Sequence, residues 1–247
     1  MTGNAAIIFG VGPRRGIGAE LCHRAARDGL HVFVNGRSEE KLQDIVAGIK
    51  AEGGSAEALP ADVTSTAAVA TAMATVASCG RPLELAVYNA GNNRPEAFLD
   101  VSTAGFENMW RVACFGGFVV AQEVVRLMLD QQGAGHRQTL LFTGASASLR
   151  GKAGFAAFAA GKGGLRMLAQ SVAREFGPRG IHVAHVVIDG VVEGDKVRSR
   201  FPEYIDKLGE DGALQPAAIA DAYMAIHAQP RSAWTQELDL RPYKEQF

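Results

Sequence analysis

The stretch that decides the fold is residues 5–20, which read Ala5-Ala6-Ile7-Ile8-Phe9-Gly10-Val11-Gly12-Pro13-Arg14-Arg15-Gly16-Ile17-Gly18-Ala19-Glu20. The apolar run before the glycines predicts a buried strand, and the residues after them predict the start of a helix. Glycines let the backbone turn sharply and approach a ligand closely, and the free N–H groups at a helix start favour a phosphate. The turn is therefore predicted to bind the phosphates of a dinucleotide; the alternative is an ordinary strand–helix connection.

Composition limits the possible classes of protein. With 247 residues, of which 47% are hydrophobic, the chain can bury a sizeable core and still form one α/β domain over residues 1–247. The net charge of −1 gives no reason to expect binding to nucleic acid or to an anionic membrane. The three cysteines are widely spaced in apolar contexts, which suggests reduced thiols and a cytoplasmic location. The histidines show no metal-ligand spacing, so no metal site is expected.

Apolar strands alternate with helical patterns along the whole chain. This alternation predicts one doubly wound domain, a parallel β-sheet with helices on both faces, and no linker interrupts it. The predicted strands are 5–9, 31–35, 55–59, 83–88, 138–142, 181–188 and 237–240, and the later predicted helices include 39–51, 105–131, 155–176 and 216–228.

Four short motifs follow predicted strands or lie in a long helix. They are Gly12-x-x-x-Gly16-Ile17-Gly18, Asp62-Val63, Asn89-Ala90-Gly91 and Lys162. With these motifs in this order, the chain resembles the short-chain dehydrogenase/reductase family from end to end. The resemblance implies a Rossmann fold that binds a nicotinamide dinucleotide across the carboxyl ends of its strands. It also implies an adenine contact from Asp62 and Val63, a floor for the cofactor from Asn89-Ala90-Gly91, and a carboxamide contact from Val191 and Val192.

The charge near the second strand indicates which dinucleotide is bound. NAD-selective sites place an acidic residue at the end of this strand, but here the chain reads Asn35-Gly36-Arg37. Arg37 can bind a 2′-phosphate bidentately, and Arg14 and Arg15 in the glycine-rich turn add positive charge. The three arginines favour NADP(H), and the alternative is that they are solvated surface side chains.

The resemblance also shows where this chain departs from the family's catalytic pattern. The family's proton-donating tyrosine lies four residues before its lysine, and here that position is Phe158, before Lys162. The position of the carbonyl-polarising serine, thirteen residues before the tyrosine, is Ala145, and the asparagine position is Ala113. Phenylalanine has no ionisable group and cannot transfer a proton. Only Lys162 is retained.

Two residues are candidate replacements for these groups. Ser146 follows Ala145, although a shift of one residue along a strand turns a side chain to the other face. Asp189 stands where relatives carry a proline, near the expected nicotinamide end, and its alternative role is that of a turn-forming aspartate. The loop and helices at about 189–215 are expected on the substrate side.

Two classes of function follow from this pattern. The first is an NADP(H)-dependent oxidoreductase with a degenerate catalytic tetrad, acting on an unidentified small molecule. The second is a catalytically inactive NADP(H)-binding sensor or regulatory protein. Either would form a homodimer or homotetramer, because family relatives pair through the two long helices, here about 105–131 and 155–176.

Overall fold

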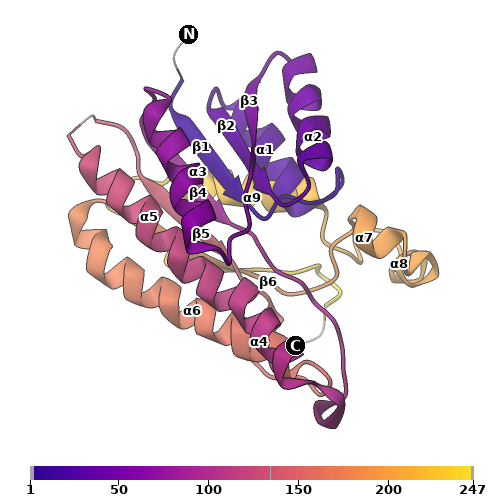
Figure 1. Ribbon diagram of the computed structural model, residues 1–247. Helices are drawn as coiled ribbons and strands as arrows, with labels where there is room; N and C mark the ends of the chain where they lie inside the picture. The colour runs from indigo at the N-terminus through magenta and orange to yellow at the C-terminus, as the bar shows by residue number, and fades with distance from the viewer. Residues whose placement is uncertain (1–2, 134, 246–247) are drawn as a thin grey trace.

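The computed structural model describes residues 3–133 and 135–245 and shows one parallel sheet of seven strands (Figure 1). The strand order is β3-β2-β1-β4-β5-β6-β7, so the order reverses beside β1. The strands are β1 (Ala5–Phe9), β2 (His31–Gly36), β3 (Ser55–Pro60), β4 (Leu83–Tyr88), β5 (Thr139–Thr143), β6 (His182–Ile188) and β7 (Glu237–Leu240). The predicted Rossmann-type sheet is confirmed, with strand bounds within one residue of those expected.

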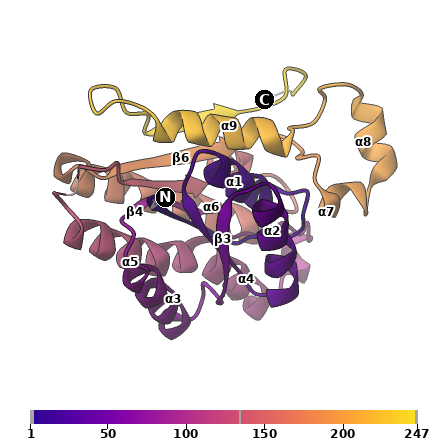
Figure 2. The same cartoon turned by 90° about the horizontal axis from the view of Figure 1, so that it is seen from above.

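Helices cover both faces of the sheet, as Figure 2 shows from above. One face carries α1 (Ile17–Arg27), α2 (Glu39–Ala51) and α9 (Pro216–His227), and the other carries α3 (Thr66–Ser78), α5 (Gly116–Asp130) and α6 (Ala156–Phe176). Alternate residues of a strand point to opposite faces. In β1, Ala6 and Ile8 therefore enter one apolar core, while Ile7 and Phe9 enter the other. Burial on both faces explains why the strands read as continuous apolar runs.

The long helix expected over 105–131 is divided in the structure. It consists of α4 (Thr103–Trp110), a π-helical turn (Arg111–Phe115) and α5. The Tyr88 hydroxyl donates a hydrogen bond to the carbonyl oxygen of Val112 within this turn. A Cβ added at Gly116 would lie 2.5 Å from the same hydroxyl, so the glycine allows β4 and the helix to approach. π-Turns often occur at functional sites, and this one contains Ala113, where the family resemblance implies an asparagine.

The remaining elements are short and lie mainly near the carboxyl ends of the strands. They are three 3₁₀ turns (Phe98–Asp100, Ser146–Ser148 and Gly177–Arg179) and the helices α7 (Asp195–Arg198) and α8 (Pro202–Leu208). The expected loop and helices after β6 are thus present.

The continuous helical run over residues 103–130 is long and apolar enough to cross a membrane by length and composition. Half of its most apolar window is buried inside the protein, and a core helix passes the same test. In the part of the chain that the structure describes, no group of three or more His, Cys, Asp or Glu side chains is placed to hold a metal ion.

Candidate functional site

The glycine-rich turn after β1 leaves open space beside its backbone. A Cβ added at Gly12 would meet no atom within 4 Å. Helix α1 follows Gly16, whose backbone is extended and which provides no capping side chain. The first N–H groups of α1 therefore have no side-chain partner from the cap, and the positive end of the helix faces the turn. Space and donors together fit the phosphates of a dinucleotide.

The Asn89-Ala90-Gly91 loop packs directly against this turn. The Asn89 N–H donates to the Phe9 carbonyl at 3.0 Å, and its side-chain amide donates to the Gly10 carbonyl at 3.3 Å. Gly10 has a φ of +80°, and a Cβ there would lie 2.4 Å from the backbone of Ala90. Only glycine suits this position, because the conformation is left-handed and the neighbouring chain is in contact. The structure thus brings two of the sequence motifs together.

The end of β2 forms the next part of the site. The Asn35 amide donates to the Leu59 carbonyl at 2.8 Å, so this side chain joins β2 to β3. The Gly36 position is crowded, since a Cβ would lie 2.5 Å from the Val11 carbonyl oxygen, and this contact places the strand end beside the glycine-rich turn. Arg37 follows with an exposed side chain. The only ionisable residue in this three-residue segment is therefore a solvent-accessible cation.

Asp62 lies after β3 and has a defined local role. Its Oδ1 accepts hydrogen bonds from the N–H and the hydroxyl of Thr64, both at 2.8 Å. The backbone hydrogen bond from Thr64, followed by its hydroxyl and the charges of Arg37 and Arg111, lowers the pKa of the Asp62 carboxyl. Arg37 and Asp62, predicted from separate motifs, therefore lie close enough to interact. Val63 beside Asp62 is buried.

Lys162 comes from α6 and reaches the carboxyl end of β5. Its Nζ donates to the Thr143 carbonyl at 2.7 Å, and a Cβ added at Gly91 would lie 3.2 Å from Nζ. Burial lowers the pKa of this ammonium from 10.5 to about 8. A partly protonated amine beside the Asn89-Ala90-Gly91 loop can donate hydrogen bonds to ribose hydroxyls.

Several described residues around Lys162 are apolar or are committed to other contacts. Phe158, one turn earlier on α6, is nearly buried. Ala113 is fully buried, and a Cβ added at Gly161 would lie 2.7 Å from the Ala113 Cβ, so an apolar contact occupies this region. Tyr88 is committed to the π-turn, and burial raises the pKa of its hydroxyl far above its usual value. The phenol at the end of β4 is thus unsuited to giving up a proton near neutral pH.

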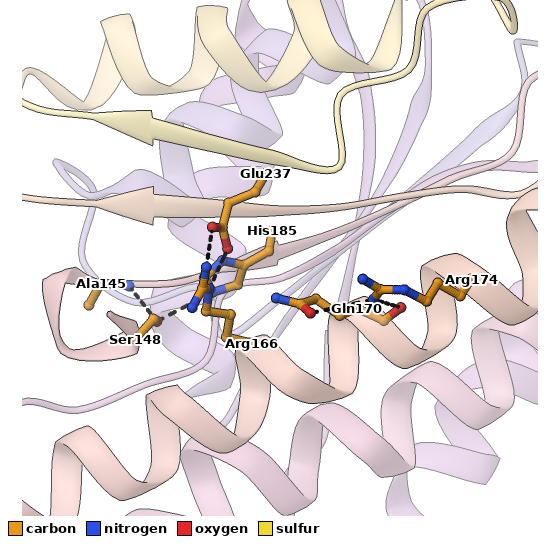
Figure 3. A network of polar contacts seen from close by, with 7 residues as sticks. All are labelled: Ala145, Ser148, Arg166, Gln170, Arg174, His185 and Glu237. Carbon is orange, nitrogen blue, oxygen red and sulfur yellow. Dashed lines mark hydrogen bonds and ion pairs between the residues drawn. The ribbon is translucent and has the colours of Figure 1, made fainter. Parts of the chain in front are cut away.

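A partly buried polar network, shown in Figure 3, includes residues of the loop that follows β5. Ser148 Oγ accepts a hydrogen bond from the Ala145 N–H at 3.1 Å and lies 3.3 Å from His185 Nε2. His185 Nδ1 lies 3.0 Å from Glu237 Oε2, and Arg166 holds both Glu237 oxygens at 2.7 Å. The hydroxyl donates to Nε2, and Nδ1–H donates to the carboxylate, because each acceptor then meets one donor. The network joins the loop to β6, β7 and α6.

Ser146 and Ser148 therefore have different environments. Ser146 begins the 3₁₀ turn after Ala145, and its carbonyl accepts the N–H groups of Leu149 and Arg150. Ser148 is the serine that enters the polar network, through its contact with His185. The sequence signal for this network is His185 itself, since an imidazole in a strand buried on both faces requires polar partners.

The Asp189 carboxylate forms ion pairs with two arginines. It is almost fully buried; one terminal nitrogen of Arg150 lies 3.0 Å and 3.1 Å from its two oxygens, and Arg241 lies 3.5 Å away. The carboxylate links the loop after β5 to the loop after β6 and the C-terminal segment. In the structure Asp189 joins these segments through ion pairs, and its role as a candidate acid near the nicotinamide end stays a prediction.

The segment after β6 closes over the turn that follows β1. Val191 and Val192 are held in place by main-chain contacts with Leu214. Asp195 exchanges two hydrogen bonds with Arg15: its N–H donates to the Arg15 carbonyl at 2.8 Å, and its carboxylate accepts the Arg15 N–H at 2.9 Å. Both Arg14 and Arg15 keep exposed side chains. The Arg15 backbone is thus fixed while its guanidinium faces solvent.

The network around His185 predicts a measurable pH dependence of stability. Burial lowers the pKa of His185 from 6.5 to about 4, although Glu237 opposes this change and Lys162 and Arg166 reinforce it. The unfolded chain therefore takes up a proton before the folded one as the pH falls, so the contribution is complete above about pH 6.5 and is lost toward pH 4. We expect the free energy of unfolding to fall by about 2–3 kcal/mol over this range on account of His185.

Urea unfolding at several pH values, compared with a His185→Gln variant, measures this contribution. The variant should show a flatter profile than the parent chain in the same interval. An unchanged slope in His185→Gln would contradict a buried, neutral imidazole.

Comparisons with known proteins agree with this geometry. A family model for short chain dehydrogenase matches residues 5–204. The chain is 29% identical over 241 residues to the short-chain reductase protein NovJ of Streptomyces niveus, covering 97% of this chain and 87% of the relative. It is 32% identical over 183 residues to a short-chain dehydrogenase/reductase of Armillaria gallica, covering 73% and 68%. The crystal structure of a short-chain dehydrogenase from Rhodopseudomonas palustris shares 38% identity with a TM-score of 0.79, covering 96% and 99%. The chain is therefore a member of the short-chain dehydrogenase/reductase family of oxidoreductases.

Proposed function

We propose that this chain is an NADP(H)-dependent oxidoreductase that acts on a small molecule and lacks the family's usual proton donor. The observation that carries the cofactor assignment is the exposed guanidinium of Arg37 at the end of β2, in a segment without a carboxylate. An acid at this position would repel a 2′-phosphate, whereas a guanidinium can bind it bidentately. Arg14 and Arg15, exposed in the adjoining turn, add to the positive potential.

The residues at the carboxyl edge have separable tasks in this proposal. The backbone N–H groups at the start of α1 bind phosphate in the open space beside Gly12, and the Lys162 ammonium donates hydrogen bonds to ribose hydroxyls. When bound, a nicotinamide cofactor supplies or accepts the hydride, and the protein provides position and electrostatics. Phe158 cannot protonate a carbonyl oxygen. An activated alkene or an imine therefore suits this site better than a simple ketone, because it depends less on a protein acid.

The alternative is an NADP(H)-binding protein without turnover, which the apolar residues at positions 113, 145 and 158 would also suit. Following NADPH oxidation with ketones, activated alkenes and imines separates the two functions. Turnover with an activated acceptor supports the oxidoreductase. Tight NADPH binding without oxidation by any of these acceptors would support the alternative.

We also propose a two-fold homo-oligomer. Helices α4, α5 and α6 form one layer of the protein (Figure 1). Four large apolar residues of these helices are 37–53% exposed, and they are Phe106, Trp110, Phe118 and Met167. Large apolar side chains exposed on one helical layer favour contact with a second copy.

Light scattering after size exclusion tests the assembly. The parent chain is expected as a dimer or tetramer, and the pair Phe118→Glu and Met167→Glu should shift it toward the monomer because two charges would be buried in the contact. Phe201→Glu, an exposed phenylalanine beside α8, is the matched control and should not dissociate the assembly. A monomeric parent chain at micromolar concentration would contradict the proposal.

A further inference from the structure

Two adjoining cavities lie at the amino ends of β5 and β6, on the edge of the sheet opposite the glycine-rich turn. Their volumes are about 180 Å³ and 610 Å³, and both are lined by Gln138, Gly180, Arg231 and Trp234. We refer to the two together as the amino-edge basin. Because β6 runs for seven residues from His182 to Ile188, the basin lies about 20 Å from the carboxyl edge. It is therefore separate from the proposed cofactor site.

The charge of the amino-edge basin has one sign. Arg137, Arg179 and Arg231 line it, and none of the described lining residues is an aspartate or a glutamate. None of these three arginines forms an ion pair with another described residue, although the charge of Arg137 contributes to lowering the pKa of Glu84. Glu84 already contacts His227 at 3.3 Å and accepts a hydrogen bond from Asn4. The basin therefore holds guanidinium groups that lack a carboxylate partner at contact distance.

Buried nitrogens without partners provide a second, independent observation. Both ring nitrogens of His136, and Nδ1 of His182, are buried and have no hydrogen-bond partner among the described residues. Both histidines line the basin. His182 is only 2% exposed, and its Nε2 lies 2.8 Å from the Thr235 carbonyl, so Nε2–H donates and Nδ1 is left over. Unpaired buried polar atoms cost free energy, and their concentration here indicates a site that a ligand completes.

The aromatic wall of the basin fixes the orientation of His182. The Trp234 ring stacks on the imidazole with a centroid distance of 4.7 Å and an interplanar angle of 1°. A neutral Nδ1 accepts a hydrogen bond, and a protonated Nδ1 donates one. A phosphate monoester has a second pKa near 6, and both it and inorganic phosphate offer P–OH donors and oxygen acceptors around neutral pH, so they can pair with either state. Sulfate offers acceptors alone. This difference favours phosphate over other oxyanions.

We propose that the amino-edge basin binds a phosphate group, with Arg137 and Arg231 as cationic partners and His182 as an imidazole partner. The ligand is inorganic phosphate or a small phosphate ester, which share this chemistry. The site goes beyond the proposed oxidoreductase function and does not rest on it.

Tryptophan fluorescence tests this site directly. The chain has two tryptophans, so Trp110→Phe leaves Trp234 as the only reporter. Inorganic phosphate, phenyl phosphate and sulfate are titrated separately at constant ionic strength. We expect a saturable change in Trp234 fluorescence with phosphate or phenyl phosphate, and a weaker response to sulfate. Tighter binding of phenyl phosphate than of inorganic phosphate would assign the site to phosphate esters, and the reverse order to the free ion.

Variants distinguish a built site from diffuse attraction. Arg231→Gln in the same background should weaken phosphate binding about tenfold, because a charge-assisted hydrogen bond is lost. Arg126→Gln, which removes an exposed arginine on α5, is the matched control and should leave the affinity unchanged. Equal melting temperatures would show that both variants fold. No saturable change with any of the three anions, or the same affinity in Arg231→Gln as in Arg126→Gln, would overturn the proposal.

Discussion

Replacing Phe158 with tyrosine and Ala145 with serine in one chain is expected to raise NADPH-dependent carbonyl reduction by about 10²–10⁴-fold, the usual contribution of general acid catalysis. Lys162 lies one helical turn from Phe158, and an ammonium with a pKa of about 8 can stabilise a tyrosinate and lower the pKa of the new phenol. Position 113 in the π-turn is an alanine packed against Gly161, so the double variant still lacks the asparagine that the family resemblance implies there. For this reason we expect the lower end of the range.

The rate of NADPH oxidation with a set of ketones and aldehydes measures this effect. Phe155→Tyr adds a hydroxyl at the start of the same helix and serves as the control, because it does not restore the position before Lys162. If the double variant is no faster than the control with any carbonyl, the absence of tyrosine and serine does not explain slow turnover. If the parent chain already reduces ordinary ketones rapidly, another acid is present, and Ser146 and Asp189 are the first residues to change.

Changing Arg37 to alanine is expected to weaken NADPH binding by about 2–4 kcal/mol, because two or three charge-assisted hydrogen bonds to the 2′-phosphate are lost. NADH binding should change little, since its ribose carries no phosphate. Arg37 is exposed, and the nearby Asp62 carboxylate is not fully buried and keeps its hydrogen bonds from Thr64 when Arg37 is removed. The expected effect therefore concerns the ligand and not the fold.

Calorimetric titration of both cofactors measures the change. Arg27→Ala removes an exposed arginine of α1 that pairs with Glu52 and is the matched control. Equal losses for NADPH and NADH in Arg37→Ala would mean that Arg37 does not recognise the 2′-phosphate.

Much of the fold could be predicted because the strands are buried on both faces. Runs such as Ala5–Phe9 and Leu83–Tyr88 are continuous and apolar, and Gly10 and Asn89 stand at the points where those strands end. The motifs depend on backbone conformations that the residue type itself indicates, such as the left-handed φ that glycine adopts at Gly10. For this reason their meeting at one edge followed from the order of the strands.

Features that depend on contacts between distant residues could not be predicted in the same way. The π-turn interrupts an evenly helical pattern because the Tyr88 hydroxyl meets the Val112 carbonyl, and nothing within 105–131 records that contact. The ion pair between Asp189 and Arg150 could not be predicted, because the two residues are 39 positions apart in sequence. The partners of His185, Ser148 and Glu237, were likewise hidden by their separation along the chain.

The most direct test of NADP(H) recognition at the carboxyl edge is the titration of NADPH and NADH into the unmodified chain, followed by nicotinamide fluorescence. The arginines at positions 14, 15 and 37, and the absence of an acid from Asn35-Gly36-Arg37, predict that NADPH binds at least about tenfold more tightly than NADH. Equal affinities, tighter binding of NADH, or no binding of either cofactor would contradict the assignment.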